Sequence, residues 1–197
     1  MHRPFYRSGA EIGGENTVLY PIFLNLSGRR CVVVGGGAVA SRKAGKLLQA
    51  GADVVVVSPE VRTELAGMDV EIQNRAYEYG DLEGANLVFT ATDSREVNAA
   101  VAKEAKERGV PVNVADRPSE GDFAVPSTLR RGGLQVAVST GGASPTLARR
   151  IRNELEEAFG PEWAGVVREF DTARRSGGAP GQDVEEEVSR CLSRLRG

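Results

Sequence analysis

Three consecutive glycines, Gly35 to Gly37, stand directly after a run of valines and directly before a stretch with helical spacing. With the residues that follow, they match the pattern G-x-G-x-x-A, which ends at Ala40. Between a strand and a helix, this pattern binds the pyrophosphate of a dinucleotide: the first glycine permits a tight turn, the second lets the phosphates approach the backbone, and the small last residue lets helix and strand pack closely. The residues predicted to bind the cofactor here are Gly35, Gly36, Gly37, Ala38 and Val39. A glycine turn that only packs is the structural alternative.

The second valine-rich run ends at Ser58 and Pro59, a tip that a dinucleotide-binding sheet places beside the adenosine ribose. An Asp or Glu at this tip normally holds the ribose 2′-hydroxyl of NAD, whereas here Ser58 forms the tip and Glu60 follows two residues later. No arginine stands at the tip to favour the 2′-phosphate of NADP. We therefore predict NAD as the cofactor, with Ser58 and Pro59 among its contacts.

A sheet must position these residues, and the pattern of the chain predicts one. Strand-length apolar runs alternate with stretches of helical spacing. The expected strands are 30–34, 53–57, 70–72, 86–91 and 110–114, and the expected helices are 38–50 and 94–108. Near-continuous valine runs separated by helices indicate a parallel sheet that is covered on both faces. The predicted fold class is therefore α/β, a Rossmann-type doubly wound parallel sheet.

The pattern changes after residue 116. Two strand-like stretches, 123–129 and 134–139, are joined by RRGG and predict an antiparallel β-hairpin. A long helix then begins with Ser144 as its N-cap and Pro145 at its first position, and 183–196 predicts a last helix. The expected regions are a flexible extension (1–18), an NAD-binding Rossmann domain (19–116), a hairpin region (117–147) and a C-terminal helical region (148–197).

Composition argues against several classes of protein. The formal net charge of −2 disfavours a nucleic-acid binder. No apolar run approaches the roughly 18–20 residues of a membrane span, and the polar N-terminus lacks the apolar core of a secretion signal. We therefore expect a cytoplasmic protein without a membrane partner. His2 is the only histidine, and Cys31 and Cys191 stand far apart, so we expect no bound metal and proton transfer through carboxylates, Tyr, Lys, Cys or water.

Four stretches, taken together, resemble the precorrin-2 dehydrogenase/sirohydrochlorin ferrochelatase family, the NAD-dependent module of siroheme synthases. They are YPIFLNLSGRRCVVVGGGAVASRKAGKLLQAGADVVVVSP, FTATDSREVN, VNVADRPSEGDFAVPS and LQVAVSTGGASPTLARRIRNELE. They cover about Tyr20 to Leu155 in the family's order. No methyltransferase domain follows them, so the resemblance implies a stand-alone form of the module.

The resemblance implies NAD-dependent oxidation of precorrin-2, a tetrapyrrole, to sirohydrochlorin. In some members the same site also inserts ferrous iron, and the sequence leaves open whether ferrous iron is a second substrate here. A homodimer is implied as well, with the hairpin region 117–147 at the subunit interface. One alternative is a dehydrogenase of another small substrate, which no Ser-Tyr-Lys set or folded-domain histidine supports. The other is an NAD(H)-sensing dimeric Rossmann module that regulates a partner without catalysis.

Asp116 matches the aspartate of the family's N-V-x-D stretch, and the resemblance makes it the catalytic general base. A carboxylate that caps the turn before Arg117 and Pro118 is the structural alternative. Because ligands of such sheets bind beyond the carboxyl ends of the strands, residues that follow the fourth and fifth strands are candidates too. The further cofactor contacts are Thr90, Ala91 and Thr92, and the first substrate contact is Asn113.

A second glycine-containing loop precedes the long helix after the hairpin, and its amides and hydroxyls could bind an anion. The predicted substrate contacts there are Ser139, Thr140 and Gly141, with a helix entry capped by Ser144 as the structural alternative. Arg149 is the remaining substrate contact. It lies within residues 110–152, which hold six basic and three acidic residues and so suit a polycarboxylate such as the tetrapyrrole of this family.

Overall fold

The computed structural model describes residues 18–193. The chain forms two compact units, of which the first spans Leu19–Ala124 and the second begins at Val125. The first unit extends past the boundary expected at residue 116 because the segment after it returns to the sheet. There the Asp122 N–H donates to the Val112 carbonyl over 2.8 Å, and Asp122 Oδ2 accepts from the Val112 N–H over 2.9 Å. Apart from Val18, the extension expected at 1–18 lies outside the described residues.

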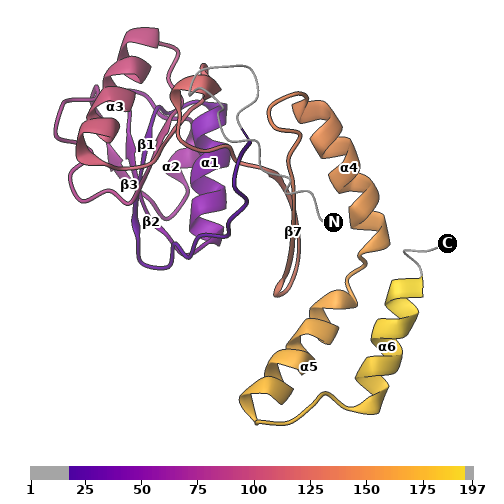
Figure 1. The fold of residues 1–197 in the computed structure, drawn as a ribbon. Helices are drawn as coiled ribbons and strands as arrows, with labels where there is room; N and C mark the ends of the chain where they lie inside the picture. The colour runs from indigo at the N-terminus through magenta and orange to yellow at the C-terminus, as the bar shows by residue number, and fades with distance from the viewer. Residues whose placement is uncertain (1–17, 194–197) are drawn as a thin grey trace, which may run out of the picture. The chain divides into compact units, whose positions relative to one another are not determined.

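The first unit is built on a five-stranded parallel sheet of order β3-β2-β1-β4-β5 (Figure 1). The strands are β1 Arg30–Val34, β2 Asp53–Val57, β3 Glu71–Gln73, β4 Leu87–Thr90 and β5 Val112–Val114. The helices are α1 Ala38–Gln49, the short α2 Thr63–Ala66 and α3 Arg95–Arg108, and the 3₁₀ turn η1 spans Pro118–Glu120. The strand order reverses between β1 and β4, which creates the switch point at which such sheets bind ligands. The predicted α/β class with a parallel Rossmann-type sheet is confirmed.

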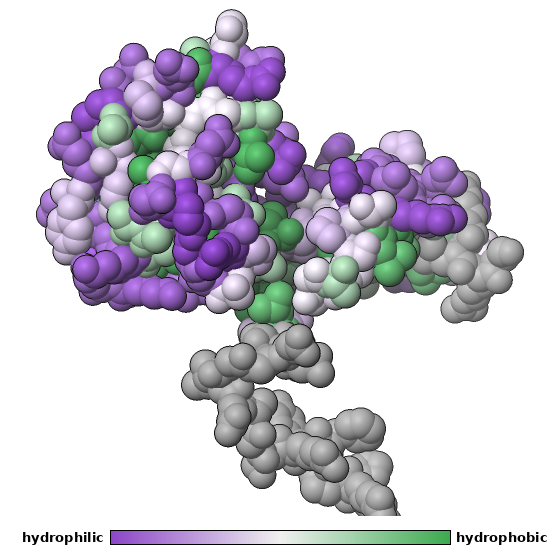
Figure 2. All heavy atoms as spheres, turned by 90° about the horizontal axis from the view of Figure 1, so that it is seen from above, coloured by the Kyte–Doolittle hydropathy of each residue, from purple (hydrophilic) through white to green (hydrophobic). Residues whose placement is uncertain are grey.

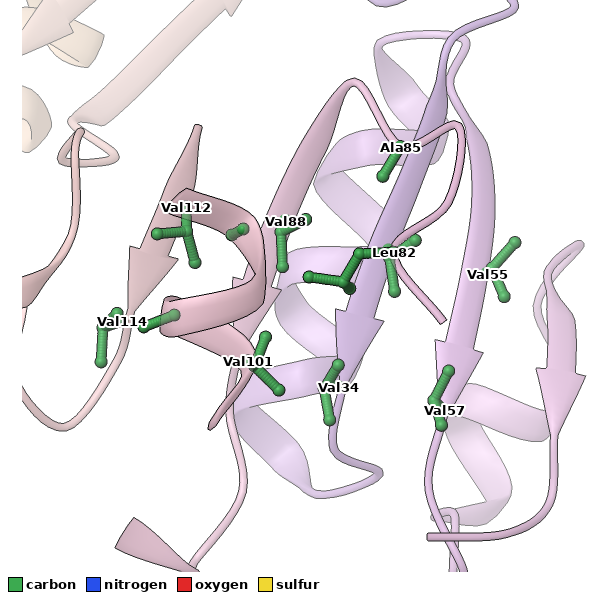
Figure 3. Packing of buried hydrophobic residues seen from close by; sticks show 12 residues of the cluster. Val34, Val55, Val57, Leu82, Ala85, Val88, Val101, Val112 and Val114 are labelled. Carbon is green, nitrogen blue, oxygen red and sulfur yellow. The ribbon is translucent and has the colours of Figure 1, made fainter. Parts of the chain in front are cut away.

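The valine runs form strands because both faces of the sheet are buried. Side chains alternate between the faces, so Val32 and Val34 join a cluster with α3 while Cys31 and Val33 join a cluster with α1. Figure 3 shows the α3-side cluster, in which Val101 of α3 faces the strand valines. Helices α1 and α3 thus cover opposite faces of one sheet.

One acid, Glu104 of α3, is fully buried and ties the segment before β4 to this helix. Its carboxylate accepts from the Tyr77 hydroxyl, from the Gly80 N–H at 3.1 Å and from Arg108 Nε at 2.6 Å. Burial by itself raises the pKa of Glu104, but the hydrogen bonds from Tyr77, Gly80 and Arg108 outweigh it and lower the pKa below its usual value. The buried charge is therefore a stabilising anchor in its ionised form.

Replacing Glu104→Gln is expected to lower the free energy of unfolding by about 1–3 kcal/mol at neutral pH, since the charge-assisted hydrogen bonds are lost. A carboxyl whose pKa is depressed in the folded state contributes stability above its unfolded value, near 4.3, and loses that contribution as the pH falls. Urea unfolding at several pH values should therefore show the gap between wild type and variant shrinking in acid. A gap that stays constant with pH would contradict the anchoring role of the charge.

Between residues 125 and 193, the second unit contains a β-hairpin and three helices (Figure 1). Strands β6 Ser127–Arg131 and β7 Leu134–Val138 pair antiparallel, which confirms the predicted hairpin. Its first strand starts later than the expected 123–129 because Phe123 packs into the core of the first unit. The helices are α4 Pro145–Ala158, α5 Trp163–Arg175 and α6 Gln182–Ser193. Trp163, Val166 and Cys191 form the buried cluster of this unit.

Figure 2 shows a mainly hydrophilic surface on which hydrophobic side chains emerge at separate points. Within residues 18–193, no helix combines the length and the apolar character needed to cross a membrane. The same residues contain no group of three or more His, Cys, Asp or Glu side chains arranged to hold a metal ion. Both cysteines are buried and free of disulfides.

Candidate active site

The three glycines between β1 and α1 meet different surroundings. Gly35 has φ +124°, and a Cβ there would lie 2.3 Å from the Ala91 carbonyl oxygen. A Cβ on Gly36 would lie 1.9 Å from the carbonyl oxygen of Glu60. At Gly37, by contrast, an added Cβ would meet no atom within 4 Å. The first two glycines are therefore required by the fold, whereas the third leaves open space beside the backbone.

Helix α1 begins at this open position without a side-chain cap. Gly37 is its N-cap residue and offers no side-chain hydrogen bond, whereas Ser94 and Ser144 cap α3 and α4 through the N–H groups of Val97 and Leu147. The first N–H groups of a helix have no acceptor within the helix, and they carry its positive dipole end. The turn thus fits a pyrophosphate: a free helix N-terminus faces a space that a side chain at Gly37 would fill.

The tip of β2 is fastened to the glycine turn. Ser58 is 7% exposed, and its hydroxyl donates to the Glu60 carbonyl over 2.6 Å. The Arg62 N–H then donates to the Gly36 carbonyl over 3.0 Å. The Ser58 hydroxyl therefore stabilises this turn, because its proton is donated to the Glu60 carbonyl. Pro59 and Glu60 lie exposed at the tip.

The end of β4 is organised by a residue that the sequence did not single out, Asn98 of α3. Asn98 is 1% exposed and accepts from the Thr92 hydroxyl over 2.8 Å. Its amide group donates to the Thr92 carbonyl and to Asp116 Oδ1, each over 3.0 Å. One buried amide thus joins the loop after β4 to the loop after β5. One feature of the sequence could have identified Asn98: it is a polar residue on the helix face that otherwise carries the buried Val101 and Ala105.

The other two cofactor contacts predicted here, Thr90 and Ala91 at the end of β4, lie next to this loop but face inward. Thr90 is fully buried in the sheet, so its hydroxyl does not reach the surface. Ala91 donates its N–H to the Val34 carbonyl over 2.8 Å and places its own carbonyl against Gly35. Of the three, Thr92 is the residue that the structure brings to the edge of the site.

Asp116 lies just beyond β5 with its side chain 35% exposed. It accepts from Asn98 at Oδ1, and Arg95 Nη1 stands 3.7 Å from Oδ2. Arg95 is held in turn by an ion pair with Glu120. The turn η1 has Arg117 at its N-cap and no side-chain cap, so the carboxylate is bound by α3 and does not cap the turn. This arrangement supports a carboxylate positioned for chemistry.

Asn113 of β5 is 8% exposed, and both ends of its amide are occupied. Its Oδ1 accepts from Lys43 Nζ over 2.6 Å, and its Nδ2 donates to the Phe123 carbonyl over 2.9 Å. Each end of the Asn113 amide thus makes one hydrogen bond within the protein, and its direct contact with the substrate stays a prediction. Lys43 was missed because a lysine within a helical pattern is typical of a solvated surface.

The loop before α4 is organised as a helix entry. Ser139 Oγ accepts from the Gly141 N–H over 3.2 Å, and the Thr140 hydroxyl donates to the Ser144 carbonyl over 3.1 Å. Ser144 caps α4, as the structural alternative predicted. Arg149 lies exposed on α4. The structure thus brings the three loop residues together and places Arg149 on the helix that follows them.

Replacing Asn98→Leu should disturb the site by removing the bridge between Thr92 and Asp116. The variant leaves buried polar groups unsatisfied, and we expect the free energy of unfolding to fall by about 1–3 kcal/mol. If Asp116 is the base, its loss of position lowers kcat on the order of 10²-fold while the affinity for the dinucleotide changes less. Urea unfolding and steady-state kinetics measure the two effects. A folded variant with wild-type kcat would show that Asn98 does not position the carboxylate.

The fold and the site define a dinucleotide-binding protein of the Rossmann class, and comparisons with known proteins agree. Residues 22–127 match the family model for putative NAD(P)-binding domains, and residues 131–158 match that for the central part of sirohaem biosynthesis proteins. The siroheme synthase of Methylobacillus flagellatus is 45% identical over 170 residues, which are 79% of this chain and 36% of that protein. That of Methylococcus capsulatus is 45% identical over 152 residues, 75% of this chain and 32% of its own length.

Among solved structures, SirC, a precorrin-2 dehydrogenase, matches with a TM-score of 0.67 and 31% identity over 79% of each chain. The chain spans about a third of the length of the siroheme synthases that it matches. It belongs to the NAD(P)-binding family of siroheme biosynthesis proteins. The resemblance seen in the sequence is thereby confirmed.

Proposed function

We propose that the chain catalyses the NAD-dependent oxidation of precorrin-2 to sirohydrochlorin in siroheme biosynthesis. The observation that carries this proposal is Asp116, a partly exposed carboxylate that Asn98 holds against the loop after β4. The similarity to a precorrin-2 dehydrogenase over 79% of both chains supports the same reaction.

The residues have distinct roles in this reaction. The backbone from Gly37 to Val39 would hold the pyrophosphate, and Thr92 would border the nicotinamide end. NAD, when bound, supplies the hydride acceptor. Precorrin-2 must lose a proton as well as a hydride, and Asp116 accepts that proton. Oδ2 is the atom that takes it, since its contact with Arg95 at 3.7 Å is longer than a hydrogen bond and leaves its lone pairs available.

Several features favour NAD over NADP. Glu60 lies exposed at the tip of β2, where a carboxylate would repel a 2′-phosphate. The nearby Arg62 is engaged with Glu64, whose carboxylate lies 3.2 Å from its Nε. On the side of the adenosine ribose, the site therefore has the exposed carboxylate of Glu60, whereas the charge of Arg62 is already paired with Glu64.

The second unit would contribute to the binding of the tetrapyrrole, whose carboxylates need cationic or N–H partners. Arg131 and Arg152 are both engaged with Glu156, whereas Arg149 lies exposed on α4. We propose that Arg149 and the loop Ser139–Gly141 bind substrate carboxylates.

We further propose a cytoplasmic homodimer. On α4, Leu147 is 49% and Ile151 is 39% exposed, and both are apolar side chains that a second copy of the chain would cover. Burial of these residues would make the second unit the subunit interface.

An anaerobic assay with purified protein, precorrin-2 and either NAD or NADP tests the proposed reaction. We expect sirohydrochlorin absorbance to rise with NAD and much more slowly with NADP. Adding ferrous iron to the sirohydrochlorin product in the presence of the protein tests whether the chain also forms siroheme. Tight NAD binding with no conversion of precorrin-2 would reject the enzyme and favour an NAD(H)-sensing module.

A further inference from the structure

Lys43, on the second turn of α1, lies between this helix and the last two strands of the sheet. Its Nζ donates to Asn113 Oδ1 over 2.6 Å and stands 4.7 Å from the centroid of the Phe89 ring. Asn113 also binds the Phe123 carbonyl, and the Phe123 ring packs edge-on against Phe89 at 5.4 Å. The amine is thus held by Asn113 of β5 and Phe89 of β4, and both of these residues contact Phe123 of the returning segment.

The charge of Lys43 has no counter-ion among the described residues. The groups that face it from β4, β5 and the returning segment are uncharged, and on its own helix Arg42 and Lys46 are both positive. Burial, together with the charges of Arg42 and Lys46, lowers the pKa of Lys43 to about 8. Half-buried charges are normally paired, so this amine is suited to an anion that arrives with a ligand.

Lys43 is connected to both the glycine turn and Asp116, the two parts of the candidate active site. Along α1 it lies roughly 9 Å from the glycine turn, at the usual rise per residue. Its partner Asn113 belongs to β5, the strand that leads directly into Asp116. The ammonium has three N–H donors, of which one binds Asn113, so donors remain for a second partner.

We propose that Lys43 binds a carboxylate of the tetrapyrrole substrate, and that Asn113 positions its amine for this contact. This inference rests on the proposed function, which supplies a polycarboxylate substrate. In this proposal Lys43 takes the place of Asn113 as the residue that contacts the substrate. A lysine that only supports Asn113 is the structural alternative, and it would affect stability without a charge-dependent effect on substrate binding.

The test compares wild type with Lys43→Gln and Lys43→Arg, and with Lys46→Gln as a control that removes the same charge from the same helix. Binding of sirohydrochlorin, followed by its absorbance, and the kcat and KM for precorrin-2 are measured from pH 6.5 to 9.5. In wild type, KM should rise as the pH passes about 8, because the ammonium loses its proton. Lys43→Gln should weaken sirohydrochlorin binding and raise KM about tenfold or more at pH 7, with little change in kcat or NAD affinity.

Lys43→Arg should keep the low KM and lose the rise near pH 8, since a guanidinium stays charged over this range. Lys46→Gln should keep the wild-type KM at pH 7. Because it removes one of the charges that lower the pKa of Lys43, its rise in KM should come at the wild-type pH or slightly above it. Equal KM and equal sirohydrochlorin binding in wild type and Lys43→Gln would overturn the proposal, as would a wild-type KM that does not change across pH 8. The binding measurement separates the two claims: charge-dependent binding without turnover would support Lys43 and reject the oxidation, and turnover with unchanged binding would do the reverse.

Discussion

Asp116→Asn is expected to abolish most of the NADH formation from precorrin-2, with kcat falling by about 10²–10⁴-fold. The asparagine keeps the size of the side chain and the contact to Asn98, but its amide cannot accept the substrate proton. The affinity for NAD, measured by titration of protein fluorescence, should stay within a factor of about two of wild type, because the pyrophosphate turn at Gly37 is separate from Asp116.

Asp53→Asn is the matched control, since it makes the same chemical change at the opposite end of the sheet, where β2 begins. It should leave kcat and NAD affinity unchanged. If Asp116→Asn turned over precorrin-2 at the wild-type rate, the general base would have to be another group and Asp116 would be left with a structural role.

The second large effect is expected from the glycine turn, where substitution of Gly37 should lower the affinity for NAD and substitution of Gly36 should lower the stability of the fold. Gly37→Ala should fold, because the added Cβ meets nothing within 4 Å and φ there is −81°. Its cost in stability should stay below about 1 kcal/mol, whereas its affinity for NAD should fall at least about tenfold, since the methyl group occupies the approach of the phosphates. Thermal unfolding and NAD titration measure the two effects.

Gly36→Ala should instead damage the fold. Its Cβ would lie 1.9 Å from the Glu60 carbonyl oxygen, so the tip of β2 must move and the bond from Arg62 to Gly36 is strained. We expect the free energy of unfolding to fall by about 3 kcal/mol or more, the upper end of the usual cost of overpacking. Gly37→Ala with wild-type NAD affinity would contradict a phosphate site at this turn.

The glycine turn and the sheet could be predicted from sequence because both depend on neighbours in the chain. A valine run followed by Gly35 and Gly37 specifies strand and turn locally, and helix stops such as Gly109 are read in the same way. The strand ends were less certain: the fourth strand was expected to run to residue 91, whereas β4 ends at Thr90, whose side chain is buried in the sheet.

Asn98 and Lys43 could not be predicted because their roles depend on contacts between distant parts of the chain. Asn98 reaches Asp116 from α3, and Lys43 reaches Asn113 across 70 positions. In the sequence both stand in ordinary helical patterns, and only the parallel order of β4 and β5 brings their partners within hydrogen-bonding distance. The requirement for glycine at Gly36 is hidden for the same reason, since its neighbour Glu60 lies on another strand tip.

Hydride transfer from precorrin-2 to NAD is the reaction that we propose for this chain. The most direct measurement is an anaerobic single turnover in which NADH and sirohydrochlorin are quantified in the same sample. We predict that the two products form together in a one-to-one ratio and that neither forms without NAD. Sirohydrochlorin formed without NADH, or NAD bound with neither product, would contradict the claim.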